Sequence, residues 1–179
     1  MEIASDIYVF TVGIVILVVI GTAAIAAAKA APWVPTWNKD VGRLIKLVDL
    51  KPGELVYDLG AGDGRLIRRI ASNYKAHAIG IELSLLPYLY TKVRNLFTSN
   101  RNLITLKYGD FFKVDLSKAD AIVCFLTPMA MKKLSPKFKR ELRPGTRIAS
   151  FAFPLPDWVP DKRDKPDKKS SPIYVYTIK

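Results

Sequence analysis

The stretch that decides the fold is residues 56–64, which read Val-Tyr-Asp-Leu-Gly-Ala-Gly-Asp-Gly. Its first half is short and apolar, as in a buried strand, its second half carries three glycines, and a helical pattern follows over 65–73. Glycines between a strand and a helix allow a tight turn and let a ligand approach the backbone closely. A simple strand-to-helix turn would use the same residues, so the motif must be interpreted together with its neighbours.

The chain on both sides of this motif alternates between strand and helix patterns. Strands are expected at 55–59, 76–83, 103–107, 121–126, 146–151 and 173–178, and helices at 39–50, 65–73, 85–97 and 132–142. This alternation predicts an α/β fold, a Rossmann-like doubly wound and mostly parallel sheet. The Pro-, Asp- and Lys-rich segment 154–171 is expected to be a loop, and the last strand is expected at or near the sheet edge.

The N-terminal segment differs in composition from the rest of the chain, because residues 7–28 form a run of 22 without a charged side chain. At about 1.5 Å per residue a helix of this length reaches about 33 Å, enough to cross a bilayer core of roughly 30 Å. We interpret residues 1–30 as a transmembrane anchor and residues 31–179 as the functional domain. A cleaved signal peptide, a buried core helix and a mitochondrial presequence are the alternatives. The absence of Lys or Arg before the run disfavours the signal peptide and the presequence.

Charge around this segment predicts its orientation. The chain of 179 residues has a net charge of +12, and all of its Lys and Arg residues follow the apolar run, whereas Glu2 and Asp6 precede it. The positive-inside rule therefore predicts a single-pass membrane protein with its domain on the cytoplasmic side. A basic domain is attracted to an anionic leaflet, to nucleic acid or to an acidic protein, and the same charge also suits a solubilising surface.

Cysteine and histidine are nearly absent. One cysteine excludes an internal disulfide framework, and Cys124 with His77 cannot supply the four ligands of a structural zinc site, so no metal is expected. Cys124 lies in an apolar segment and is expected in the core. His77 is expected to be a surface or half-buried residue, at the start of a strand and at the wrong end of the sheet for chemistry.

Glu82 ends the second predicted strand, 24 residues after Asp58. A carboxylate at this position of the fold accepts hydrogen bonds from the hydroxyls of a ribose. Two features distinguish the chain from nicotinamide-binding proteins: the glycine spacing is GxGxG rather than GxGxxG, and Asp58 would repel a pyrophosphate beside the turn. A cofactor with a cationic amino-acid end would instead be attracted by Asp58. A third motif, residues 108–112 (Tyr-Gly-Asp-Phe-Phe), places an acid and aromatic rings after the third strand, where they suit an adenine.

Together, "YDLGAGDGR", "GIEL" and "YGDFF" resemble the motifs of class I S-adenosylmethionine-dependent methyltransferases. The resemblance spans residues 33–151 and implies S-adenosyl-L-methionine as the cofactor. It implies that the methionine end lies against the first motif, the ribose on the acid of the second, and the adenine on the third. The implied cofactor-binding residues of these motifs are Asp58, Gly60, Ala61, Gly62, Glu82, Asp110 and Phe111.

A narrower resemblance rests on "APWVPT" (31–36), "GDFFKVDLSKADAIVCFL" and "LSPKFKRELRPGTRIAS". These segments are similar to a small family of protein-lysine methyltransferases with broad-specificity crenarchaeal and membrane-anchored mitochondrial members. In that family the Val-Pro-Thr segment folds over the cofactor, which implies that Val34, Pro35 and Thr36 contact the cofactor or line a lysine channel, with Pro35 and Thr36 expected to bind the cofactor. The chain departs from the family at Trp37, at residues 150–153 and at residues 161–170, the region expected to hold the penultimate strand.

The sequence offers no clear general base. The fourth strand ends in Leu126-Thr127-Pro128 and lacks the Asn/Asp-Pro-Pro-aromatic motif that holds a planar nitrogen, which favours a flexible primary amine such as lysine over adenine or glutamine. Thr127, Trp33 and Trp37 are candidates to line a lysine channel, although tryptophans here also suit packing at a membrane interface. We therefore expect a membrane-anchored enzyme that transfers a methyl group to a lysine of a protein by direct displacement, with membrane proteins among the candidate substrates. Nucleic acid or a small molecule as substrate, or a non-catalytic cofactor-binding module, is the alternative.

Overall fold

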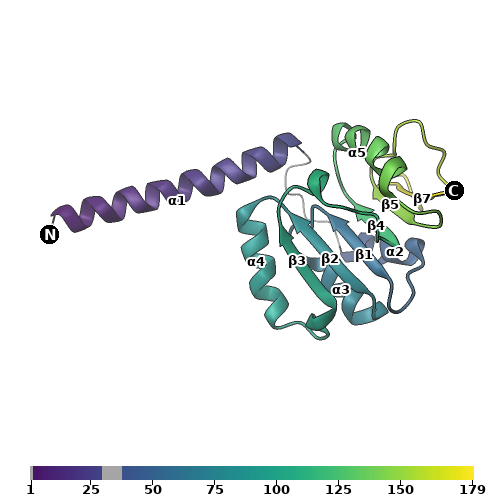
Figure 1. Cartoon of the computed structure of the whole chain (residues 1–179), viewed down its shortest axis with the longest axis horizontal. Helices are drawn as coiled ribbons and strands as arrows, with labels where there is room; N and C mark the ends of the chain where they lie inside the picture. The colour runs from purple at the N-terminus through teal and green to yellow at the C-terminus, as the bar shows by residue number, and fades with distance from the viewer. Residues whose placement is uncertain (1, 30–37) are drawn as a thin grey trace.

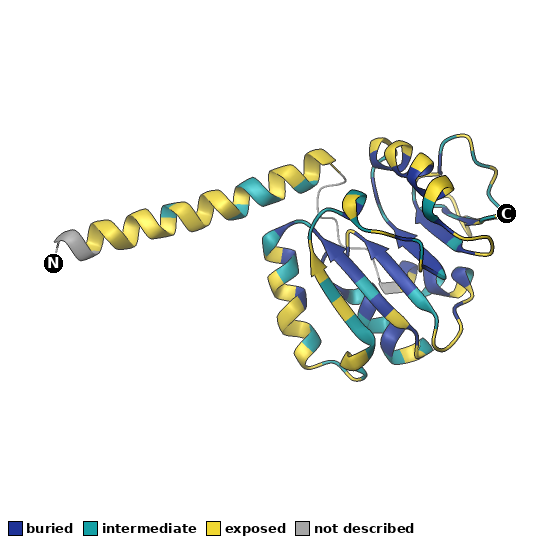
Figure 2. Cartoon of the chain, in the orientation of Figure 1, coloured by how far each residue is buried: buried dark blue, intermediate teal, exposed yellow. Residues whose placement is uncertain are grey.

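The computed structural model describes residues 2–29 and 38–179, and Figure 1 shows a long helix projecting from an α/β domain. The helix α1 (Glu2–Lys29) leaves the domain for most of its length, and nearly all of its described side chains are exposed (Figure 2). It is long and apolar enough to cross a membrane, a test that a signal sequence near an N-terminus also passes. Its side chains are mainly valine, isoleucine, leucine and other apolar residues, so the helix has no polar face. Most of this apolar surface is not covered by the rest of the described chain.

The domain is built on one sheet of seven strands in the order β3-β2-β1-β4-β5-β7-β6. Five strands are parallel, and the last two in this order join them through antiparallel pairings. The strands are β1 (Leu55–Leu59), β2 (His77–Glu82), β3 (Ile104–Tyr108), β4 (Ala121–Cys124), β5 (Arg147–Phe151), β6 (Lys162–Asp164) and β7 (Ile173–Thr177). The predicted doubly wound, mostly parallel α/β sheet is confirmed.

Helices and short 3₁₀ turns complete the described part of the domain. They are α2 (Asn38–Val48), α3 (Arg65–Tyr74), α4 (Leu85–Leu96), α5 (Pro128–Glu141), η1 (Arg101–Leu103) and η2 (Phe111–Lys113). The apolar stripes of α2 and α3 pack on one face of the sheet, and α5 packs on the other through Met131, Leu134 and Phe138. The central strands are buried on both faces, so ligands can reach the sheet only at its edges or at the ends of its strands.

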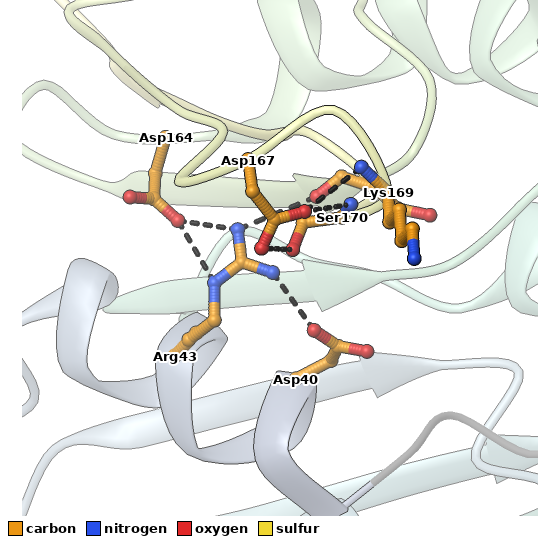
Figure 3. A network of polar contacts seen from close by, with 7 residues as sticks. Asp40, Arg43, Asp164, Asp167, Lys169 and Ser170 are labelled. Carbon is orange, nitrogen blue, oxygen red and sulfur yellow. Dashed lines mark hydrogen bonds and ion pairs between the residues drawn. The ribbon is translucent and has the colours of Figure 1, made fainter.

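The C-terminal region differs from the sequence prediction. Residues 162–164 lie within the predicted loop but form β6, the edge strand. Strand β7 lies next to it, which agrees with its predicted place at or near the edge. Arg43 of α2 holds this segment: its Nε donates to Asp164 at 3.0 Å and its Nη1 to Asp40 at 2.8 Å (Figure 3). In the same figure, Asp167 closes the following turn by accepting backbone N–H groups at 2.7–2.8 Å. Short, charged edge strands resist pairing with other chains, and their composition resembles that of a loop.

The helix predicted at 132–142 begins earlier, at Pro128. Proline is tolerated in the first helical turn because its missing N–H would have no intrahelical partner, and Thr127 caps the helix by accepting the N–H of Ala130. The remaining boundaries agree with the predictions to within about two residues, the usual uncertainty of helix and strand ends. Strand β4 ends at Cys124, and with 4 residues it is the shortest in the structure of the strands that were predicted.

Candidate active site

A cavity of about 290 Å³ opens at the carboxyl ends of β1, β2 and β4. This is where ligands bind in open doubly wound sheets, because the strand order reverses there and the flanking loops diverge. Its walls combine three acids with a largely apolar surround. The lining residues include Ala23, Ala26, Val41, Leu44, Asp58, Gly60, Ala61, Gly62, Asp63, Arg65, Glu82, Ser84, Phe111, Phe125, Leu126, Thr127, Phe151 and Phe153.

The glycine-rich turn between β1 and α3 forms the floor of this cavity. The N–H groups of Gly60 and Ala61 both donate to the carbonyl of Ile81, at 2.9 and 3.0 Å, which fastens the turn to β2. Gly64 adopts a φ of 71°, and a Cβ there would lie 2.3 Å from Cγ2 of Thr91. Only glycine fits that position without moving α4, so the sequence of the turn also fixes the place of α4.

Glu82 is buried at the end of β2 and already supports the turn. One carboxylate oxygen accepts the N–H of Gly62 at 2.8 Å, and the other accepts the N–H of Ser84 at 2.7 Å. A carboxylate offers about four lone-pair positions, so about two stay available on the cavity side. That arrangement suits two neighbouring hydroxyl groups, as a ribose presents them. Ser84 was missed by the sequence analysis, although its place two residues after Glu82 is a signal that could have found it.

Asp58 lines the cavity from the end of β1, and its side chain is only 6% exposed. Burial, together with the negative charges of Glu82 and Asp63, raises its pKa to about 8. Among the residues that the structure describes, none donates a hydrogen bond to its carboxylate or pairs with it. Asp63 differs, because Arg65 pairs with it: although burial opposes ionisation, the hydrogen bonds from Arg65 lower its pKa. The described part of the cavity thus holds one uncompensated acid, which suits a cationic ligand group.

Asp110 and Phe111 have separate positions. Phe111 is buried and lines the cavity, whereas Asp110 lies outside the lining, caps η2 by accepting the N–H of Phe112 at 3.0 Å, and pairs with Lys29 at 2.8 Å. Burial opposes ionisation of Asp110, but the bonds from Lys29 and the Phe112 N–H outweigh it and lower its pKa. An adenine contact from Asp110 would have to accommodate this ion pair.

The end of α1 reaches the cavity, a contact that the sequence pattern does not predict. Ala23 and Ala26 line it, and Thr22 accepts the N–H of Leu85 through its Oγ1 at 3.3 Å. With the Lys29–Asp110 pair, these contacts join the last two turns of α1 to the domain. The small side chains of this alanine-rich stretch leave room for the cavity beneath them.

The predicted channel residues and the predicted cofactor-binding residues Pro35 and Thr36 divide into two groups. Thr127 lines the cavity and also caps α5. Trp33, Val34, Pro35, Thr36 and Trp37 lie outside the described residues. Three phenylalanines that were not predicted as site residues, Phe125, Phe151 and Phe153, also line the cavity. The rings of Phe125 and Phe151 pack edge to face, with their centroids 4.8 Å apart.

The histidine and the cysteine of the chain are not placed for acid–base chemistry, and the described residues show no metal-binding cluster. His77 is exposed at the amino end of β2, away from the cavity, and Cys124 is buried, with burial raising its pKa to about 12. Both positions confirm the sequence predictions. Within residues 2–29 and 38–179 no group of three or more His, Cys, Asp or Glu side chains is arranged to hold a metal ion.

The sequence of residues 58–162 matches the family model of the ANTKMT methyltransferase domain. The chain belongs to this methyltransferase family. Its relatives include the protein-lysine N-methyltransferase of Saccharolobus islandicus, 33% identical over 153 residues that cover 82% of this chain and 93% of that protein. The adenine nucleotide translocase lysine N-methyltransferase of Mus musculus is 32% identical over 131 residues, 72% of this chain and 56% of that protein. The methyltransferase thus spans only about half the length of its mouse relative.

Solved structures agree with this assignment. An RNA methyltransferase from Salinibacter ruber, in complex with S-adenosyl-L-homocysteine, is 32% identical with a TM-score of 0.77, covering 81% of this chain and 94% of that one. A methyltransferase from Geobacter sulfurreducens, in complex with the same compound, is 26% identical with a TM-score of 0.57, covering 65% of this chain and 49% of that one. The predicted family and the predicted cofactor, S-adenosyl-L-methionine, are confirmed, and the uncompensated Asp58 fits the ammonium of its methionine end.

Proposed function

We propose that this methyltransferase is anchored in a membrane by α1 and methylates lysine side chains of proteins close to the membrane surface. The observation that carries the proposal is the junction of α1 and the cavity: Ala23 and Ala26, from the last turns of the apolar helix, line the same cavity as Asp58 and Glu82. A protein anchored through α1 would therefore hold its reaction site beside the bilayer.

The cofactor-binding roles follow from the geometry of the cavity. Asp58 would bind the ammonium of the methionine end, the two free lone-pair positions of Glu82 would accept the ribose hydroxyls, and Phe111 would pack on the adenine. The turn residues Gly60, Ala61 and Gly62 would lie against the cofactor without side chains in its way. Bound there, S-adenosylmethionine would supply a methyl group on a positively charged sulfur: the bond from the amine nitrogen to the methyl carbon would form as the carbon–sulfur bond breaks, leaving S-adenosylhomocysteine.

The chain's own contribution to the transfer is to desolvate and align the amine. A free lysine has a pKa of ~10.4, so its neutral form at pH 7 costs about 4.6 kcal/mol. Walls made of Phe125, Phe151 and Phe153 disfavour an ammonium and so lower this cost. No general base is required if the amine loses its proton to water before it enters, and Thr127 would then line the approach of the amine and orient it.

Charge predicts the side of the membrane. All Lys and Arg residues follow the uncharged part of α1, and Lys29 in its last turn is paired with Asp110 of the domain. The positive-inside rule therefore favours the cytoplasmic side for the domain. A substrate lysine in the juxtamembrane region of a membrane protein is within reach of an enzyme held in this way, as are basic tails of proteins at the inner surface.

RNA methylation is a second candidate function, favoured by the likeness to the RNA methyltransferase of Salinibacter ruber and by the net charge of +12. Two observations oppose it: the likeness to two protein-lysine methyltransferases, and the sequence after β4, where Thr127-Pro128 replaces a motif for planar nitrogens. An RNA substrate would also not explain why an apolar helix lies beside the cavity.

The test is transfer of a labelled methyl group by the full chain in its native membrane. The purified chain would be reconstituted into membranes that lack this enzyme, and S-adenosylmethionine carrying a tritiated methyl group and total RNA would be added. We expect label in a discrete membrane protein, lost in a Glu82→Ala variant that still folds. Label in the RNA fraction would instead establish the second candidate.

A further inference from the structure

Helix α4 leaves a continuous apolar face uncovered. Six large apolar side chains on or next to it are between 45% and 86% exposed: Leu86, Leu89, Tyr90, Val93, Leu96 and Phe97. Phe97, the most exposed of them, follows the last turn directly. Single exposed apolar residues are ordinary on a protein surface, whereas a contiguous set along one helix marks a site of interaction.

Helical geometry places these six side chains on one stripe. At about 100° per residue they fall within an arc of about 120°, which faces away from Pro87 and Thr91, the residues buried against the domain. Lys92 and Arg94 flank the arc on its two sides, and the Arg94 guanidinium lies over the Tyr90 ring at 5.9 Å from its centre. An apolar stripe with cations along both borders is the pattern of a helix that lies in a membrane interface.

The sequence segment that contains α4 has a single sign of charge. From residue 83 to residue 109 the sequence contains no Asp or Glu, and its charged residues are Lys92, Arg94, Arg101 and Lys107. Each cation near an anionic leaflet contributes about 1 kcal/mol of attraction. A protein partner with an acidic groove would also be attracted, but it would have to cover a long, nearly flat stripe of aliphatic and aromatic side chains.

The position of α4 relative to α1 favours lipid as the occupant. The two helices are in contact, and the Leu85 N–H at the start of α4 donates to Thr22 near the end of α1 at 3.3 Å. Figure 1 shows that α1 projects from the side of the domain on which α4 lies, and that α4 runs crosswise to it. A bilayer crossed by α1 would therefore run along α4, whose outward side is largely exposed in Figure 2.

We infer that α4 is an interfacial helix whose exposed stripe enters the headgroup region of the membrane. This inference rests on the proposed anchoring by α1. Because the stripe holds the domain at a second place on the bilayer, the domain cannot turn freely about its anchor. The cavity at the α1 end is then held at one height and one orientation above the bilayer.

The test measures the depth of a nitroxide attached to the full chain in vesicles of phosphatidylcholine and phosphatidylserine. A Val93→Cys variant carries the label in the centre of the stripe, and a Lys132→Cys variant carries it at an exposed position of α5 as a matched control. Cys124 is buried and stays unlabelled. We expect the label at 93 to be more accessible to oxygen, which dissolves in lipid, than to a water-soluble nickel chelate, with the reverse order at 132.

The outcomes separate the inference from the anchor on which it rests. Failure of the chain to float with the vesicles would overturn the anchor, and the inference with it. A chain that floats while label 93 stays accessible to the nickel chelate would overturn the inference and leave the anchor standing. Dipolar broadening between labels of two copies, without a change in depth, would assign the stripe to a second copy of the chain and would also overturn the inference.

Discussion

The ionisation of Asp58 gives the sharpest prediction, because the cavity by itself favours the neutral form of this acid. Its pKa of about 8 reflects burial and the neighbouring charges of Glu82 and Asp63. An ammonium from the cofactor favours the carboxylate, so binding at pH 7 must release a proton. Affinity for S-adenosylmethionine is therefore expected to rise by up to about tenfold per pH unit between about pH 6 and pH 8. Above pH 8 it should fall again, as the amino group of the cofactor itself loses its proton at a pKa of roughly 8.

The Asp58→Asn variant keeps the shape of the side chain and removes its charge. Leaving the ammonium without a partner costs about 2–5 kcal/mol, so binding at pH 8 should weaken at least thirtyfold and lose its dependence on pH below 8. Stability should change in the opposite direction. The folded pKa lies above the value of 3.8 for the free side chain, so the folded state holds the proton between these values and its free energy of unfolding falls as pH rises. The variant should escape that loss and be more stable than the native protein at pH 8.

Calorimetric titration of the full chain with S-adenosylmethionine, repeated in buffers of different ionisation enthalpy, measures both the affinity and the protons released. Urea unfolding of the cofactor-free protein at pH 5 and pH 8 supplies the stability comparison. If the Asp58→Asn variant binds the cofactor more weakly but is more stable at pH 8, the loss of affinity comes from the lost contact and not from a damaged fold. An affinity that is flat between pH 6 and pH 8, with no proton released, would exclude Asp58 as the partner of the ammonium.

Three further predictions concern other parts of the fold. Glu82→Ala removes the acceptor for two backbone N–H groups and for the ribose, so calorimetry should give at least thirtyfold weaker cofactor binding by a folded protein; unchanged binding would exclude Glu82 from the site. Gly64→Ala should lower the free energy of unfolding, measured in urea, by more than about 3 kcal/mol, because backbone strain adds to the clash with Thr91. The control Gly145→Ala has the same left-handed backbone but open space around it, and should cost only about 1 kcal/mol. Equal losses in the two variants would show that the clash does not matter. Arg43→Ala should release β6 and speed hydrogen exchange of its amides with little change in β1; equal exchange in both proteins would show that Arg43 does not hold the edge.

The local sequence pattern is sufficient to predict most of the fold and part of the site. The turn at 60–64 follows from glycine spacing, and its register with Glu82 follows from parallel pairing of β1 with β2. Strand β6 was missed, because Lys162, Arg163 and Asp164 have the composition of a loop and become a strand only through Arg43 and pairing with β7. Such tertiary contacts cannot be predicted from a short stretch of sequence.

The rest of the site depends on distant segments that meet only in the folded chain. Ala23 and Ala26 are indistinguishable from the other alanines of the apolar run, and their place in the cavity depends on how α1 meets α4. The pairing of Asp110 with Lys29 spans 81 positions and gives Asp110 a partner that its motif does not predict. The neutral state of Asp58 follows from depth of burial, which is a property of the whole domain.

The proposed function requires that the methyl group goes to a lysine of a protein beside the membrane. Mass spectrometry can show the acceptor, in membrane proteins that have reacted with the full chain and S-adenosylmethionine carrying a deuterated methyl group. The Asp58→Asn variant serves as the control. We expect deuterated methyl-lysine at a discrete site in a juxtamembrane segment, strongly reduced with the variant. Deuterated methyl groups found only in RNA, or only on lysines of proteins without any relation to the membrane, would contradict the proposal.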